Sequence, residues 1–373
     1  MKRTLLSVTG SAVVAGAVLV SGGPAWAATV TQVPAAPAGA IGGFTDAVAV
    51  SATDGWAVGG NGSGVIQRFN GTRWNLTTIP DLLDGGANNW ALLYGVDATS
   101  AGNALAVGQS TAASGGAKTA VALRWNGTAW SKQAVPKPGG NDTELTAVKA
   151  FSASDAWAVG QQASAGSTFR NTLAMHYNGT AWAAVPTPSP GTRTNFVTAV
   201  DGVSGTDVWL AGYSLNLPYG NRIRQSLIEH WNGTAWTQIP TPNNGATYLY
   251  DVAAVSPTDA WAVGYGSTGG AFVLRWNGTA WQSVAAPPLF SLQSVAARSG
   301  SDVWVAGSDA AGAPALAHWD GAAWSVTPVT VSGGVGTPTL DAVTLATAST
   351  EWAVGAQQDA TTGQSSFLAY RVG

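Results

Sequence analysis

Residues 259–281, which read DAWAVGYGSTGGAFVLRWNGTAW, decide the fold because both ends of this stretch recur along the whole chain. The tryptophan slot of its first half is filled seven times, at spacings of 43 to 52 residues, by Trp56, Leu105, Trp157, Trp209, Trp261, Trp304 and Trp352. Two copies are degenerate, since Leu105 replaces tryptophan and Trp352 is followed by no second tryptophan. Such a period is typical of an array, a solenoid or a propeller. The sequence therefore predicts architecture far more closely than function.

Each repeat predicts four short strands. In the fifth copy these are the apolar run 252–255, the WAVG segment 261–264, the alternating segment 272–276 and a segment that starts at Trp281. Asn277-Gly278 lies between two β-rich runs, which predicts a tight hairpin of type I′ with positive φ at both central residues. Prolines end the fourth strands and stop pairing there. No stretch has a sustained helical period.

Seven such units, with apolar residues on both faces of the second and third strands, predict an all-β, seven-bladed β-propeller with four-stranded antiparallel blades. An open β-solenoid is the alternative, but its rungs are usually shorter and lack the hairpin. The seven repeats cover residues 44–80, 91–136, 144–186, 196–240, 248–286, 291–328 and 339–373.

The last repeat stops without a fourth strand, whereas the segment 28–34, ATVTQVP, resembles the fourth strand 235–240, AWTQIP. We therefore predict that residues 28–37 supply the missing strand of blade 7. The ring would then be closed, and the edge that an open array exposes would be paired.

The first 27 residues have the layout of a secretory signal peptide. Lys2 and Arg3 precede an apolar run at 5–20, and the AWA at 25–27 is an A-x-A cleavage site. A membrane anchor is the alternative, but the run is short for a span and polar residues interrupt it. We expect cleavage after Ala27 and a secreted, extracellular protein.

Charge and cysteine content exclude several classes of function. Only 9% of the residues are charged, and the chain without its leader has 14 basic and 19 acidic residues, a net charge of −5. A nucleic-acid partner is not expected, because such proteins need clustered cations. The absence of cysteine excludes a disulfide framework. We expect a monomer without a membrane span once the leader is removed.

The blades resemble those of kelch-type propellers, such as the propeller of galactose oxidase, and of seven-bladed propeller lectins with DG-x-W blades. An apolar first strand, a second strand ending in glycine, and an aromatic-Asn/Asp-Gly turn followed by tryptophan carry this resemblance, which covers the whole mature chain. Repeats of the DVWAVG and HWNGTAW kind are also similar to those of secreted bacterial proteins. The chain departs from kelch in having single glycines, except at Gly59-Gly60. The copper-radical chemistry of galactose oxidase is excluded, because its Cys-Tyr crosslink needs a cysteine, and no cofactor is expected.

The polar residues that recur with the repeat are interpreted as structural. One slot of the third strand holds His176, His230, His318, Arg68, Arg124 and Arg275. Repeat symmetry separates these residues around the ring, so they cannot form one metal site or activate one nucleophile, and we expect each to span the gap to the next blade. Five aspartates precede the second-strand tryptophan by two positions, and we expect them to cap the turn before it: Asp54, Asp155, Asp207, Asp259 and Asp302. We predict no catalytic residue and no metal site.

The repeated tryptophans are predicted to be core residues, because every tryptophan of the mature chain except Trp90 occupies a repeat slot. The loops on one face of the ring are long and differ between blades, which is where recognition usually lies on a rigid scaffold. The richest is 213–226. The candidate ligand-binding residues are Trp90, Arg170, Arg193, Tyr213, Asn216, Tyr219, Asn221, Arg222, Arg224 and Tyr250. A solvated loop without a ligand is the alternative reading.

Three functions are compatible with this pattern. The first is a non-catalytic binding protein that recognises a glycan or other extracellular polymer through the variable-loop face. The second is a polysaccharide hydrolase or lyase, with a site at the channel mouth near Asp46, Tyr94, Tyr250 and Asp341. The third is an extracellular scaffold that binds other proteins.

Overall fold

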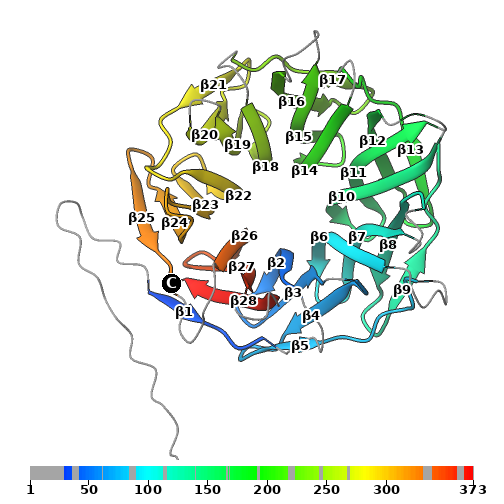
Figure 1. Ribbon diagram of the computed structural model, residues 1–373, viewed down its shortest axis with the longest axis horizontal. Coiled ribbons are helices and arrows are strands. Elements are labelled where there is room, and N and C mark those ends of the chain that lie inside the picture. The colour runs from blue at the N-terminus through cyan, green and yellow to red at the C-terminus, as the bar shows by residue number, and fades with distance from the viewer. Residues whose placement is uncertain are drawn as a thin grey trace, which may run out of the picture.

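The computed structural model describes residues 29–35, 42–60, 62–83, 90–111, 116–138, 140–164, 167, 169–190, 194–216, 223–242, 247–266, 269–330, 338–358 and 365–372. These residues form seven four-stranded antiparallel sheets set around a central axis, as Figure 1 shows. The predicted seven-bladed β-propeller is thereby confirmed. The predicted signal peptide lies outside the described residues.

In each of the first six blades, consecutive strands pair from the channel outward. The strands of blades 1 to 3 are β2 (Phe44–Ser51), β3 (Asp54–Gly59), β4 (Val65–Phe69), β5 (Trp74–Leu76), β6 (Trp90–Ser100), β7 (Asn103–Thr111), β8 (Thr119–Trp125), β9 (Trp130–Gln133), β10 (Gly140–Ser152), β11 (Asp155–Ser164), β12 (Arg170–Tyr177) and β13 (Trp182–Val185). Those of blades 4 to 6 are β14 (Thr194–Ser204), β15 (Asp207–Asn216), β16 (Ile223–Trp231), β17 (Trp236–Gln238), β18 (Thr247–Ser256), β19 (Asp259–Gly266), β20 (Gly270–Trp276), β21 (Trp281–Val284), β22 (Ser291–Ser299), β23 (Asp302–Ser308), β24 (Pro314–Trp319) and β25 (Trp324–Pro328).

Blade 7 is built from both ends of the chain. Its strands β26 (Pro338–Thr347), β27 (Thr350–Gln358) and β28 (Ser365–Val372) are completed by β1 (Val30–Gln32). The register places Val30 opposite Val372 and Gln32 opposite Tyr370. Strand β1 and the C-terminus lie together in Figure 1. The predicted closing strand is confirmed, and the outer edge of β28 is paired.

The hairpin between the third and fourth strands is present, but the predicted type I′ turn is wrong. In blade 1, Phe69 pairs with Trp74, so four residues connect the strands. Gly71 has a φ of 93°, whereas Asn70 is not among the described residues with positive φ. The Asn70 carboxamide oxygen instead accepts hydrogen bonds from the backbone N–H groups of Thr72 and Arg73, at 3.2 and 3.1 Å. The asparagine thus closes the loop through its side chain.

The repeated tryptophans form the contacts between blades. Their prediction as core residues is confirmed except at Trp231, Trp276, Trp319 and Trp324, which are partly buried. Trp56 of β3 is fully buried, and its ring centroid lies 5.0 Å from the centroids of Trp125 and Trp130 in blade 2. Burial of such a ring contributes about 4 kcal/mol. At the closing boundary, Trp352 of blade 7 lies 4.7 Å from Phe69 and 5.4 Å from Trp74 of blade 1. The boundary that joins the two ends of the chain is therefore packed like the others.

The repeated aspartates pair with the third strand, so their predicted role as turn caps is wrong. Asp54 holds Arg68 through two bonds of 2.8 Å, and the guanidinium lies over the Trp56 ring at 4.9 Å. The turn is capped by Ser51, whose hydroxyl oxygen accepts a hydrogen bond from the backbone N–H of Thr53 at 3.2 Å. These pairs lie on the face of short, uniform turns.

The histidines contact aspartates of their own blade, contrary to the expectation that they span the gap to the next. Their Nε2 atoms lie 2.8, 2.6 and 2.9 Å from aspartate oxygens in the pairs His176–Asp155, His230–Asp207 and His318–Asp302. The expectation holds for Arg68 and Arg124, which donate to the carbonyl oxygens of Ala101 and Ala153 in the next blades, each at 3.4 Å.

A bulge in each first strand explains why every WAVG-like segment ends in glycine. In blade 5 the register skips Tyr250, between Leu249 and Asp251. A Cβ on the facing Gly264 would lie 1.8 Å from the Tyr248 carbonyl oxygen. The other blades show the same close approach, at 1.9 to 2.1 Å. Glycine is thus required so that the bulge can turn one side chain per blade toward the channel.

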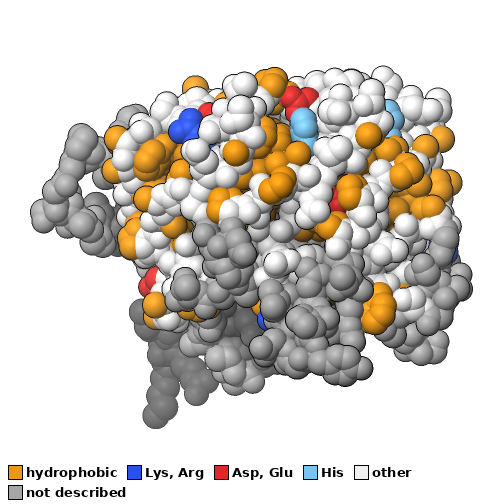
Figure 2. Space-filling view, turned by 90° about the horizontal axis from the view of Figure 1, so that it is seen from above, with side chains coloured by type: hydrophobic (Ala, Val, Ile, Leu, Met, Phe, Trp, Pro, Cys, Tyr) orange, Lys and Arg blue, Asp and Glu red, His pale blue; other side chains and the backbone are white. Residues whose placement is uncertain are grey.

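The rim of the disc carries few charges. Figure 2 views the molecule edge-on and shows hydrophobic and uncharged side chains, with isolated charged groups between them. This agrees with the low content of charged residues. No helix in the described part of the chain is long and apolar enough to cross a membrane.

Candidate functional site

The seven bulge residues line a central cavity of about 470 Å³. Three are threonines, Thr45, Thr146 and Thr198, whose hydroxyls contact carbonyl oxygens of their own and the next blade. The other four are Tyr94, Tyr250, Gln293 and Asp341. The four residues expected at the channel mouth, Asp46, Tyr94, Tyr250 and Asp341, therefore all border one cavity.

Carboxylates deeper in this cavity tie neighbouring blades together. The two oxygens of Asp46 accept hydrogen bonds from the backbone N–H groups of Ala47 in blade 1 and Val96 in blade 2, at 2.8 and 2.9 Å. Burial raises the pKa of Asp46 to about 8, despite these bonds. In blade 3 the Lys149 ammonium lies 2.8 Å from Asp201 and 3.9 Å from Asp97. These contacts connect the first strands of neighbouring blades, which indicates a structural role.

Asp341 differs from these bridging carboxylates. Its side chain accepts one hydrogen bond, from the Thr339 hydroxyl at 3.0 Å. Burial raises the pKa of Asp341 to about 6. Across the described ranges, no group of three or more His, Asp or Glu side chains is placed to hold a metal ion.

A continuous row of six aromatic rings lies on the variable-loop face of blades 4 to 6. We call it the aromatic row, and its members are Phe196, Tyr213, Tyr248, Tyr250, Tyr265 and Phe290. Five of them lie in strands, in the halves nearest the loops of this face, and Phe290 immediately precedes β22. Phe290 is 43% exposed and the other five rings are partly exposed.

Strand register builds this row within blades, and packing joins it between them. Phe196 faces Tyr213 across β14 and β15, with ring centroids 4.8 Å apart. Tyr248 faces Tyr265 across β18 and β19 in the equivalent positions, at 6.2 Å. Tyr213 then meets Tyr248 edge-on at 5.0 Å, across the boundary between blades 4 and 5. Tyr265 lies 5.2 Å from Phe290, which extends the row to blade 6.

One cation adjoins the row. The Arg224 guanidinium carbon lies 4.9 Å from the Tyr248 ring centroid, a cation–π distance. The charge of Arg224 also acts on Tyr213 and Tyr250, whose pKa values burial raises and this arginine lowers. Within the described residues, the hydroxyls of the row's four tyrosines form no hydrogen bond with the protein, so they can bind a ligand or water.

The same slots are polar in blade 3. Glu144 replaces the aromatic residue of the first strand and Gln161 that of the second, and they are joined by a 2.6 Å hydrogen bond. Lys118 and Arg170 bind Glu144 at 2.5 and 3.2 Å, and Arg170 also binds Asp142 at 2.7 Å. The variable-loop face thus has an aromatic sector and an ion-paired sector.

The structure brings together three of the ten predicted ligand-binding residues, Tyr213, Arg224 and Tyr250. Arg170 is engaged in the ion pairs of blade 3, and Trp90, 37% exposed, begins β6 in blade 2. Asn216 ends β15, and nothing is described of its side chain. Arg193, Tyr219, Asn221 and Arg222 lie outside the described residues.

Sequence reasoning missed Phe196, Tyr248, Tyr265 and Phe290. A signal for three of them, Phe196, Tyr248 and Tyr265, exists in the repeat itself. The residue after the WAVG glycine is tyrosine in blades 4 and 5, at Tyr213 and Tyr265. Phe196 and Tyr248 likewise share the slot two positions before the bulge residue. Aligning the repeats through their glycines would have shown two adjacent blades with aromatic pairs.

The arrangement of blades defines the class of this chain, a seven-bladed β-propeller with a closed ring. No family model and no curated protein sequence matches the chain. The resemblance to kelch repeats and to galactose oxidase therefore stays a prediction.

Solved structures share the fold. YCF48 bound to a D1 peptide is 15% identical, with a TM-score of 0.57, over 92% of this chain and 94% of that one. The WD40 β-propeller domain of Doa1 is 12% identical, with a TM-score of 0.56, over 92% of this chain and 97% of that one. The fucose-specific lectin from Aleuria aurantia is 14% identical, over 74% of this chain and 94% of that one, with a TM-score of 0.46. At these identities the first two likenesses show the fold alone, and the third is too distant to bear on function.

Proposed function

We propose that this protein is an exported, non-catalytic binding protein that recognises a glycan or other extracellular polymer through its variable-loop face. The aromatic row is the observation that carries this proposal. Partly exposed tyrosine rings offer apolar faces for the C–H groups of a sugar, while their hydroxyls remain free for its polar groups. The row crosses three blades, so it suits an extended ligand better than a single small molecule.

The scaffold fits this role. The rings stand on paired strands of a closed ring, and sites on such elements are held more precisely than sites on loops. Tyr213 and Tyr265 lie on β15 and β19, which are each paired on both sides. A rigid row loses little conformational freedom when a ligand binds.

Affinity electrophoresis through gels that contain single polysaccharides tests the proposal. We expect at least one polymer to retard the protein, and Tyr248→Ala together with Tyr265→Ala to abolish the retardation. Leu76→Ala is the matched control, because Leu76 is 51% exposed at the end of β5 and lies outside the row. Normal mobility of the wild type in every polysaccharide, including cell-wall preparations, would refute the proposal.

A polysaccharide hydrolase or lyase is the second candidate, and Asp341 is the observation that favours it. This carboxyl borders the channel with a pKa raised to about 6, a value suited to a general acid. Product release from a polymer panel, abolished in Asp341→Ala and retained in Gln293→Ala, would establish this activity. Unchanged polymers after prolonged incubation would exclude it for that panel.

A further inference from the structure

We infer that the ligand of the aromatic row is an anionic polysaccharide, and that Arg224 is the residue that selects its charge. This inference rests on the proposed function and specifies the class of polymer.

Arg224 is the cation without an anionic partner beside the row. Among the described residues, no carboxylate lies within ion-pair distance of its guanidinium. Elsewhere on the same face, Lys118 and Arg170 are neutralised by Glu144 and Asp142. On the opposite face, Arg68 and Arg275 are held by aspartates of their own blades. Among the described residues of the variable-loop face, Arg224 is therefore the cation without a carboxylate partner that lies beside the aromatic row. Lys137, which is exposed on the same face, lies in blade 2 and donates to the Thr119 hydroxyl at 3.3 Å.

The geometry leaves the edge of the guanidinium open. Arg224 lies over the Tyr248 ring at 4.9 Å, and stacking of this kind uses the flat face of the group. Its N–H groups then remain for a carboxylate or sulfate, which guanidinium can bind through two parallel hydrogen bonds. The carboxylate closest in sequence to the row, Asp251, is occupied by hydrogen bonds from Val252 and Val295, each at 2.8 Å.

A polysaccharide fits this surface better than an acidic peptide. Peptides commonly bind by adding a strand to a free sheet edge or by inserting side chains into pockets. The row instead presents successive aromatic rings, two of them on strands that are paired on both sides. Stacking faces with one adjacent cation match a chain of sugar rings that carries periodic negative charge.

The net charge of the whole chain predicts how binding should depend on salt. The net charge of −3 opposes binding of a polyanion in general, so attraction must be local. Salt should therefore weaken binding only moderately, since few ion pairs form. A polyanion that bound through diffuse attraction would show a much steeper dependence on salt.

Matched polymer pairs test the inference by isothermal titration calorimetry on the full chain. Polygalacturonate, alginate and hyaluronan are each compared with their methyl esters, which keep the backbone and remove its charge. We expect one acidic polymer to bind about tenfold more tightly than its ester. Arg224→Gln should reduce this ratio to about one, while Arg224→Lys should keep part of it. Arg73→Gln, an exposed arginine on the opposite face, should leave the ratio unchanged.

The outcomes separate the inference from the proposed function. Binding of no polymer, acidic, esterified or neutral, overturns both. Equal binding of acid and ester, both lost in Tyr248→Ala, keeps the function and overturns the preference for charge. A charge preference that survives Arg224→Gln, in a variant whose melting temperature matches the wild type, overturns the role of Arg224. Tighter binding of polyglutamate than of every polysaccharide would assign the surface to an acidic protein.

Discussion

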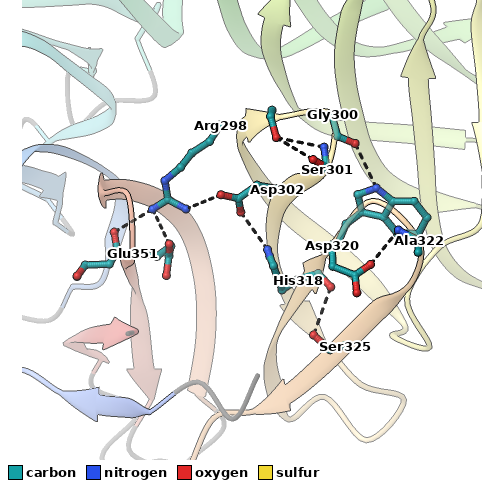
Figure 3. A network of polar contacts seen from close by, with 12 residues as sticks. Arg298, Gly300, Ser301, Asp302, His318, Asp320, Ala322, Ser325 and Glu351 are labelled. Carbon is teal, nitrogen blue, oxygen red and sulfur yellow. Dashed lines mark hydrogen bonds and ion pairs between the residues drawn. The ribbon is translucent and has the colours of Figure 1, made fainter. Parts of the chain in front are cut away.

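Arg298 of β22 and Glu351 of β27 are joined across the boundary between blades 6 and 7, with Nη2 and Oε1 2.5 Å apart. Figure 3 shows Arg298 between Glu351 and Asp302, which in turn contacts His318. Both members depart from the repeat. The Arg298 slot is otherwise filled by Val50, Thr99, Phe151, Val203, Val255 and Ala346, and that of Glu351 by Gly55, Ala104, Ala156, Val208, Ala260 and Val303.

This pair predicts asymmetric effects of substitution. Arg298→Val leaves Glu351, which is 3% exposed, as a buried charge without its cation, so we expect a loss of about 3 kcal/mol in the free energy of unfolding. Glu351→Ala should cost less, because Arg298 keeps Asp302. The double variant restores the residues of other blades and should approach the wild type. Urea unfolding measures all three. Equal losses in the two single variants, added together in the double, would contradict a coupled pair.

Glu229 predicts a pH dependence of stability. It occupies a buried slot of β16, where it is 0% exposed. Neither carboxyl oxygen accepts a hydrogen bond of normal geometry from the described residues, and the Ser189 backbone lies near enough only to lower the pKa of Glu229 slightly against the effect of burial. Burial raises its pKa to about 8. The unfolded chain ionises near pH 4.5, so between these values the folded state holds the extra proton. Stability should then be greatest below pH 4.5 and fall as the pH rises toward 8, by on the order of 4 kcal/mol from this group.

Glu229→Gln should remove that contribution. Asp46 and Asp251 also have raised pKa values, so the relevant quantity is the difference between the variant and the wild type. We expect the variant to gain stability relative to the wild type as the pH rises from 4.5 to 8, in urea unfolding at several pH values. Parallel curves for the two proteins across this range would show that Glu229 ionises normally.

Gly264 predicts a steric limit at the bulge. Gly264→Ala would place a methyl group 1.8 Å from the Tyr248 carbonyl oxygen, so β18 must move away from β19. We expect a loss of about 3 kcal/mol in stability, together with weaker polymer binding, because Tyr248 and Tyr265 face each other there. Gly102→Ala is the control, since its Cβ would meet no atom closer than 4.0 Å. Full polymer binding by a stable Gly264→Ala protein would show that the bulge does not position the row.

We predict that the stability of the propeller depends on β1, because this strand closes the ring. A chain that begins at residue 28 keeps β1, whereas one that begins at residue 42 loses it and leaves the outer edge of β28 unpaired. We expect the longer chain to melt cooperatively and the shorter one to melt at lower temperature and to aggregate, because exposed strand edges pair between molecules. Calorimetry and light scattering compare the two. Identical melting curves would mean that β1 adds nothing to the ring.

Most of the fold could be predicted from the sequence because the same four-strand pattern recurs seven times along the chain. The spacing of Trp56 and its equivalents predicted the blade count, and the likeness of 28–34 to 235–240 predicted the closing strand. The details that failed depend on pairing between strands. Asp54 precedes a turn, but its partner Arg68 arrives from the third strand, which sequence proximity does not show. Asn70 likewise closes its loop through its side chain rather than by adopting positive φ.

The aromatic row shows why the candidate site was harder to predict. Tyr213 and Tyr250 were proposed from loop composition, but both stand in strands, and the ring that connects them, Tyr248, was not predicted. Tyr213 and Tyr248 are separated by a complete hairpin in the chain and meet only because blade 5 packs against blade 4. No local pattern specifies that contact.

By itself, the sequence determined the number of blades, their strands, the buried tryptophans and the way the ring closes. These features follow from periodic alternation and turn chemistry, which act between residues close in the chain or repeated along it. The tertiary structure alone decided which side chains share the variable-loop face and which cation lies beside the aromatic row. Those properties arise because residues distant in sequence are brought together by strand register, by a one-residue bulge and by the packing of adjacent blades.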